Sequence, residues 1–179
     1  MTYYLSWLPD ILRAAGLTVV EEPGWQTRGH GDVGTIQGVL LHHTACGPVG
    51  EAPSIDTVIN GRPDLAGPLA QLVLGRSGTF YVVAAGKCWH AGAGAWEGVT
   101  DGNAHLIGIE AENMGTSADP WPEGQMDAYA KGVAAILKHI GASVGMCARH
   151  AEYALPAGRK IDPSFDGNEF RARVAAYMS

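Results

Sequence analysis

Apolar residues gather in four short blocks that predict buried strands. Residues 35–42 are predominantly apolar and end in histidine, and residues 106–111 form a second block of this kind. Residues 69–74 and 79–84 flank the sequence Gly-Arg-Ser-Gly, which is typical of a hairpin turn. The pattern therefore predicts two buried strands and one antiparallel hairpin.

The clearest helical spacing covers residues 124–140, and it predicts a helix that ends at Gly141. The apolar stripe of this helix consists of Met126, Tyr129, Val133, Ile136, Leu137 and Ile140. Shorter helices are predicted over residues 6–15, over residues 54–60 with Ser54 as the cap, and over residues 169–177. A glycine-rich arm covers residues 24–34. Strands and helices mix without strict alternation, which predicts a single α/β domain with a central mixed β-sheet flanked by helices.

Composition excludes several classes of function. The net charge of −6 argues against a nucleic-acid partner, because binding phosphate groups requires a basic face. The chain has no apolar run of the ~18 residues that cross a bilayer, so we expect no membrane insertion. The start of the chain lacks a basic segment followed by an apolar one, which predicts synthesis in the cytoplasm without a signal peptide. The three cysteines cannot all pair within one chain. The protein is expected to be a monomer.

Histidines and one aspartate offer a metal site. His42 and His43 end the first predicted strand, where a ligand is held rigidly, and the residues alone leave open which of the two would bind. His150 is followed twelve positions later by Asp162, with Lys160 just before it. Two histidines and an aspartate leave the fourth position of a tetrahedral zinc ion open, as in catalytic sites. No His-Glu-x-x-His helix of the common zinc proteases is present.

Further candidates surround these ligands in the sequence. Glu110 ends a strongly apolar strand, where a carboxylate is unfavourable unless it has a task, and Glu112 is a reserve on the same strand face. A groove for substrate is predicted to involve His43, Trp89, His90, Trp96 and Asn113. Core packing is an equal alternative for the two tryptophans, and Cys147 is expected in the core.

Four motifs in order resemble the type-2 N-acetylmuramoyl-L-alanine amidase family, which includes phage amidase lysozymes and peptidoglycan recognition proteins. They are His42-His43-Thr44, Trp89-His90-Ala91-Gly92, Ile107-Gly108-Ile109-Glu110, and His150 with Lys160-Ile161-Asp162-Pro163. The resemblance makes residues 34–165 the family core, with an N-terminal helix and arm over 1–33 and a C-terminal helix over 166–179. Residues 34–38, 60–65 and 154–160 are similar to amidase domains of actinobacterial phage endolysins.

The resemblance implies roles for individual residues. His42, His150 and Asp162 would hold Zn²⁺, and Lys160 would stabilise the oxyanion formed at the substrate carbonyl. Glu110 would be the general base, as in the cytosolic branch of the family. The phage-lysozyme branch uses a tyrosine on the strand before the hairpin, and residues 69–72 contain none.

The expected activity is hydrolysis of the amide bond between the lactyl group of N-acetylmuramic acid and L-alanine in peptidoglycan. A phage or prophage endolysin that reaches the wall during host lysis is the expected setting, with a recycling amidase as the bacterial alternative. Two other functions stay open: a muropeptide-binding module without catalysis, and a zinc peptidase that cuts within the stem peptide.

Overall fold

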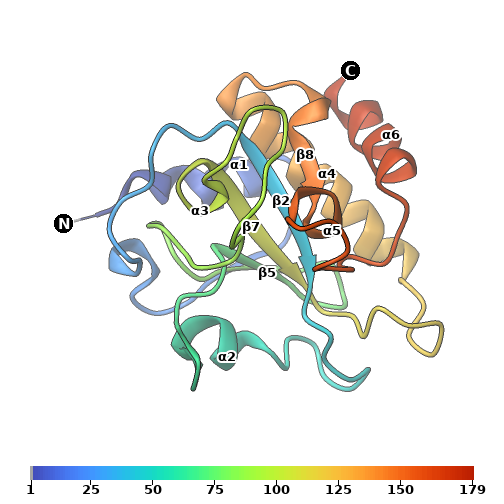
Figure 1. Ribbon diagram of the computed structural model, residues 1–179, viewed down its shortest axis with the longest axis horizontal. Coiled ribbons are helices and arrows are strands. Elements are labelled where there is room, and N and C mark those ends of the chain that lie inside the picture. The colour runs from blue at the N-terminus through green and yellow to red at the C-terminus, as the bar shows by residue number, and fades with distance from the viewer. Residues whose placement is uncertain (1) are drawn as a thin grey trace.

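Within residues 2–179, which the computed structural model describes, six strands form one mixed sheet in the order β1-β6-β5-β7-β2-β8 (Figure 1). The strands are β1 (Val19–Glu21), β2 (Gly38–His43), β5 (Leu72–Leu74), β6 (Phe80–Val82), β7 (Leu106–Ala111) and β8 (Cys147–Arg149). β2 runs parallel to β7 and β8, β5 runs parallel to β7, and β5 and β6 are antiparallel. The predicted α/β domain with a central mixed sheet is confirmed.

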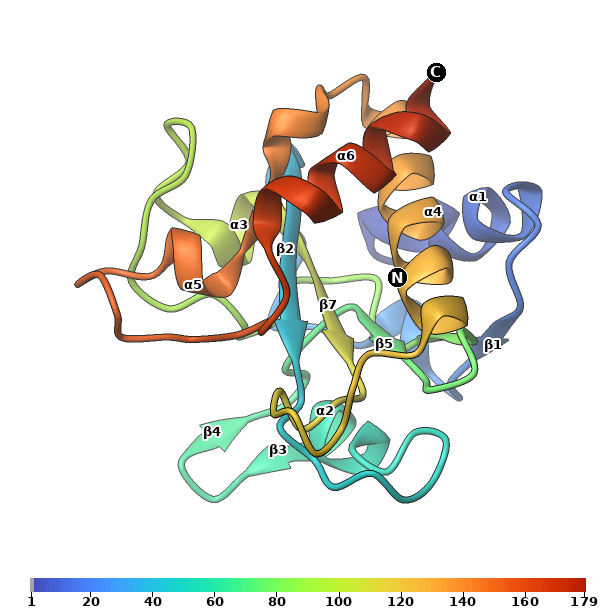
Figure 2. The same ribbon diagram turned by 90° about the vertical axis from the view of Figure 1, so that its right-hand side faces the viewer.

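The helices cover both faces of this sheet (Figure 2). They are α1 (Leu8–Ala14), α2 (Ile55–Asn60), α3 (Gly102–His105), α4 (Glu123–Ile140), α5 (His150–Tyr153) and α6 (Gly167–Met178), with short 3-10 helices at Tyr4–Trp7, Trp25–Thr27 and Val144–Met146. α1, α4 and α6 share the largest hydrophobic core with one face of the sheet. α3 and α5 lie on the other face, and α2 lies beyond the carboxyl ends of β2 and β7 (Figure 2). The second face is therefore more open than the first.

Side chains of β2 alternate between the two faces, as the period of a strand requires. Val39 and Leu41 belong to the core under α4, whereas Leu40 belongs to a smaller cluster on the opposite face. His42 follows Leu40 by two positions and therefore points to that opposite face. The chemistry of the chain thus lies on the face away from the long helix.

The predicted elements agree with the structure where their sequence pattern is long. The strand over residues 106–111 has the expected bounds, and α4 begins one residue earlier than predicted. Gly141 ends α4 with a positive φ of 69°, which a glycine adopts without strain. Ser54 does precede α2, but its hydroxyl donates to Glu112 at 3.0 Å, so it does not cap the helix. The helix predicted over residues 6–15 divides into a 3-10 turn and α1.

Several short elements were not predicted from the sequence. β1, β8, α3 and α5 are three or four residues long, and the small hairpin of β3 (Gly61–Arg62) and β4 (Leu65–Ala66) is shorter still. The hairpin lies below the carboxyl end of β2 in Figure 2. In the described part of the chain, no helix combines the length and the apolar character needed to cross a membrane.

Candidate active site

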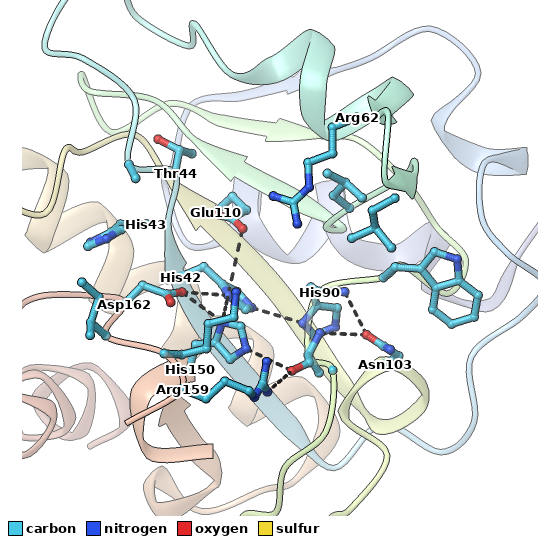
Figure 3. A pocket seen from close by; sticks show the side chains of 18 residues that line it. His42, His43, Thr44, Arg62, His90, Asn103, Glu110, His150, Arg159 and Asp162 are labelled. Atoms are coloured by element: carbon cyan, nitrogen blue, oxygen red, sulfur yellow. Dashed lines mark hydrogen bonds and ion pairs between the residues drawn. The ribbon is translucent and has the colours of Figure 1, made fainter. Parts of the chain in front are cut away.

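Three neighbouring parallel strands bring chemical groups to one level of the sheet. In the register of β2 and β7, His42 lies opposite Glu110. Leu41 lies opposite Arg149 of β8. The residues that follow them, His42 and His150, therefore lie side by side. The carboxyl ends of parallel strands are a common place for ligands and catalytic groups. This register explains how residues more than a hundred positions apart meet (Figure 3).

His42, His150 and Asp162 form the metal-ligand candidate. The Nδ1 atoms of the two histidines are 3.0 Å apart. Oδ2 of Asp162 lies 3.2 Å from Nδ1 of His42 and 3.1 Å from Nδ1 of His150. Asp162 reaches this position because its backbone carbonyl accepts a hydrogen bond from the Ala151 N–H at 2.8 Å, which ties the loop to α5. Three ligand atoms thus converge within one coordination radius of a common point.

The surroundings of these atoms fit a divalent cation. Nε2 of His150 lies 3.0 Å from the Ala91 carbonyl, which only accepts, so Nε2 carries the proton and Nδ1 presents a lone pair. Burial and the neighbouring His150 lower the pKa of His42 to about 4, despite Asp162, so this imidazole is neutral near pH 7. Two neutral imidazoles and a carboxylate are a donor set that zinc accepts.

Glu110 lies beside this cluster with an unused carboxylate oxygen. Its Oε1 is 4.0 Å from Nδ1 of His42, and its Oε2 has no hydrogen-bond partner among residues 2–179. Burial, together with the charges of Asp162 and Glu112, raises the pKa of Glu110 to about 8. A cation in the neighbouring cluster would lower this pKa, because it favours the charged carboxylate. Such a group suits proton transfer near neutral pH.

The cluster forms the floor of a cavity of about 790 Å³. The wall carries three cationic residues, Arg62, Arg159 and Lys160 (Figure 3 labels the two arginines). The remaining lining residues are His42, His43, Thr44, Ala45, Leu65, Leu69, Trp89, His90, Ala91, Gly92, Asn103, Glu110, His150, Ile161 and Asp162. A cavity of this size, with three cationic residues in its wall, can accommodate a small anionic ligand.

A family model described as N-acetylmuramoyl-L-alanine amidase matches residues 32–165. The chain therefore belongs to the N-acetylmuramoyl-L-alanine amidase family. The predicted class of enzyme, an amidase, is confirmed by this match. No curated relative matches the chain.

The structure of the chain is also similar to several solved structures. AmpD, as a selenomethionine derivative, is 24% identical with a TM-score of 0.65, and the match covers 97% of this chain and 99% of AmpD. AmiD from E. coli is 22% identical with a TM-score of 0.63, and the match covers 86% of this chain and 65% of AmiD. The endolysin amidase LysCS from Clostridium intestinale URNW is 17% identical with a TM-score of 0.61, covering 88% of this chain and 95% of LysCS. At these identities the likeness concerns the fold.

Most of the residues predicted for the site meet in the cavity of the amidase. The five predicted metal and catalytic residues all line it, as do three of the predicted substrate contacts, His43, Trp89 and His90. His43 is 8% exposed, and burial lowers its pKa. Burial also lowers the pKa of His90 well below its ordinary value.

Two of the predicted groove residues and the reserve base lie elsewhere in the described chain. Trp96 donates its indole N–H to the Gly145 carbonyl at 2.8 Å and packs into a small core cluster, so it does not line the cavity. Asn113 is fully buried, and its Oδ1 accepts the Gly115 N–H at 2.7 Å. Glu112 is also buried, where it accepts hydrogen bonds from Thr44 and Ser54. These three side chains serve the packing of loops around the site. Cys147 is fully buried, as expected.

Two lining residues were not assigned from the sequence. Arg62 lies in the β3–β4 hairpin, and its membership of the motif over residues 60–65 was the available signal. Asn103 accepts the backbone N–H groups of His90 and Ala91 with one oxygen, each at 2.9 Å. No spacing in the sequence indicates that contact, because it joins the one-turn helix α3 to an irregular segment.

Proposed function

We propose that this chain hydrolyses, with zinc, the amide bond between the lactyl group of N-acetylmuramic acid and the L-alanine of the stem peptide. The observation that carries the proposal is the convergence of His42, His150 and Asp162 beside the unpartnered carboxylate oxygen of Glu110, in a chain of this family. AmiD, which shares the fold, was solved with the substrate anhydro-N-acetylmuramic acid-L-Ala-D-γ-Glu-L-Lys. That molecule contains the bond in question.

His42, His150 and Asp162 would hold the zinc ion through two imidazole nitrogens and one carboxylate oxygen. When bound, zinc supplies Lewis acidity: it stabilises negative charge on oxygen and makes water more acidic. Three protein ligands leave room for substrate at the ion, which is the pattern of catalytic rather than structural sites.

Glu110 is the proposed general base and acid. Its carboxylate accepts a proton from the attacking water and later donates that proton to the nitrogen of the leaving L-alanine. The position suits both steps, because Glu110 faces the cavity next to His42 without a fixed partner for Oε2 in residues 2–179. Removal of this carboxyl group should stop turnover while the metal ligands stay in place.

Lys160 is the proposed stabiliser of the oxyanion. It lines the cavity and lies two residues before Asp162, so one extended segment carries a metal ligand and a cation. A fixed positive charge near the developing oxyanion favours the transition state over the neutral carbonyl of the substrate. The chain thereby provides a base and a cation around one reacting bond.

The cavity walls suit the rest of a muropeptide. Arg62 pairs with Asp64 at 3.0 Å through Nε, is about half exposed and lines the cavity. A guanidinium group binds carboxylates in a bidentate manner, and stem peptides carry free carboxylates. His43 and Trp89 are the proposed contacts for the less polar parts of the substrate.

The proposed setting is lysis of a bacterial host by a phage or prophage. Residues 60–65 and 154–160 resemble actinobacterial phage endolysins, and LysCS, an endolysin amidase, shares the fold. In this setting the enzyme is made in the cytoplasm and acts on the wall after release. An enzyme of this kind should cut intact sacculi at least as well as soluble anhydromuropeptides, and the reverse preference would favour a recycling role.

Mass spectrometry of digested peptidoglycan tests the proposal. Zinc-loaded protein should release intact stem peptides with a free L-alanine N-terminus, and chelator-stripped protein or Glu110→Gln should release none. Cleavage within the stem peptide would instead indicate a peptidase. Binding of muropeptide by zinc-loaded protein without any cleavage would indicate a binding module.

A further inference from the structure

The loop of residues 89–92 contacts both histidines of the metal-ligand cluster. Nδ1 of His90 lies 3.2 Å from Nε2 of His42, and the Ala91 carbonyl lies 3.0 Å from Nε2 of His150. Both contacts are made by the ring nitrogens that point away from Asp162. Two adjacent residues of one loop therefore support the outer side of two ligands (Figure 3).

The direction of the hydrogen bonds follows from a backbone carbonyl. Nε2 of His90 lies 3.2 Å from the Leu106 carbonyl, which only accepts, so this nitrogen carries the proton. In a neutral His90, Nδ1 then accepts, and it accepts the Nε2–H of His42. His42 is left with a bare Nδ1 that faces His150 and Asp162. The opposite tautomer of His42 would place a hydrogen where a metal ion must bind.

His90 is held in this orientation from two sides. Its ring packs directly on Gly108 of β7, where a Cβ atom would lie 2.7 Å from Cγ of the imidazole. Asn103 accepts the backbone N–H groups of His90 and Ala91, which fixes the loop above the sheet. The imidazole planes of His42 and His90 are nearly perpendicular, at 89°, so an edge of one ring meets the other. Such support is what a precise metal ligand requires.

We propose that His90 is a positioning residue of the metal centre, which sets the tautomer of His42, while the Ala91 carbonyl sets that of His150. This inference rests on the metal site of the proposed function. It replaces the predicted role of His90 as a substrate contact, because both ring nitrogens of His90 are engaged inside the protein. Partners of this kind orient metal-bound histidines and tune their basicity.

Zinc affinity of three variants tests the proposal. His90→Phe keeps a ring over Gly108 but removes the acceptor for His42, and we expect zinc affinity to fall about 10- to 100-fold in a chelator competition. His90→Asn retains an acceptor close to the position of Nδ1 and should recover most of this loss. His139→Gln changes an exposed histidine of α4 and serves as the control, with wild-type affinity expected. Circular dichroism establishes that each variant is folded.

Nitrogen-15 NMR of the histidine rings gives a readout that a general loss of stability would not mimic. Zinc-loaded wild-type protein should show His90 and His42 protonated at Nε2, with the metal at Nδ1 of His42. Equal zinc affinity of wild type and His90→Phe, or a proton on Nδ1 of His90, would overturn the inference. Loss of affinity in His90→Phe without any cleavage of peptidoglycan by the wild type would support the inference and refute the proposed function.

Discussion

The buried carboxyl group of Glu110 should make the metal-free protein less stable as the pH rises. Its pKa is raised from an ordinary 4.5 to about 8, so between these values the folded state holds a proton that the unfolded state has released. Each pH unit in this window then lowers the free energy of unfolding by ~1.4 kcal/mol. The full effect is at most ~5 kcal/mol. It will be smaller because the side chain is 20% exposed. Glu110→Gln carries no such proton and should escape this loss.

Chemical denaturation of chelator-stripped protein at pH 5 and pH 8.5 measures the effect. The stability of Glu110→Gln relative to wild type should increase from the lower to the higher pH by at most ~4 kcal/mol, because part of the full effect is already lost at pH 5. Glu97→Gln, a change at an exposed surface carboxylate, should leave the pH profile of the wild type unaltered. Profiles of wild type and Glu110→Gln that run parallel would refute the reasoning, because the raised pKa would then have no counterpart in folding.

Two further predictions follow from other residues of the site. Lys160→Met should lower kcat by ~10²–10³-fold with little change in zinc affinity, and Lys160→Arg should restore part of the rate. A higher KM at unchanged kcat would instead assign Lys160 to substrate binding. Tyr129→Phe should cost ~1–3 kcal/mol in the free energy of unfolding, because the buried hydroxyl accepts the His42 N–H and donates to the Ile109 carbonyl. Tyr4→Phe at an exposed position is its control, and equal denaturation midpoints for the two variants would contradict the assignment.

The sequence predicted the fold where a local pattern was long enough to repeat. The helix over residues 124–140 has several periods of apolar residues, the strand over 106–111 is a mainly apolar block, and the bounds of both agree closely with the structure. β1 and β8 have three residues each and show no alternation. β8 is a strand because it pairs with β2. Pairing with a distant segment gives three residues no recognisable sequence pattern of their own.

The candidate site was predicted as a set of residues but not as an arrangement. His42, His150, Asp162, Glu110 and Lys160 were identified largely through ordered motifs, and all five line one cavity. The sequence contained no information about which nitrogen of each histidine faces the cluster, because hydrogen bonds to distant backbone carbonyls decide this. For the same reason it placed Trp96 in the groove, although that indole is engaged by Gly145.

The division between strand ends and loops has a consequence for how this enzyme can diversify. The ligands His42 and His150 and the carboxylate of Glu110 belong to paired strands and the residue that follows one, where a shift of one register position would turn a side chain to the other face. The rim of the cavity belongs to the β3–β4 hairpin and to residues 155–159, and neither segment is part of the six-stranded sheet. Mutation or exchange of these rim segments can therefore alter which substrates bind while the reacting groups stay in place, and they are the natural grafting points for changing the substrate preference of the amidase.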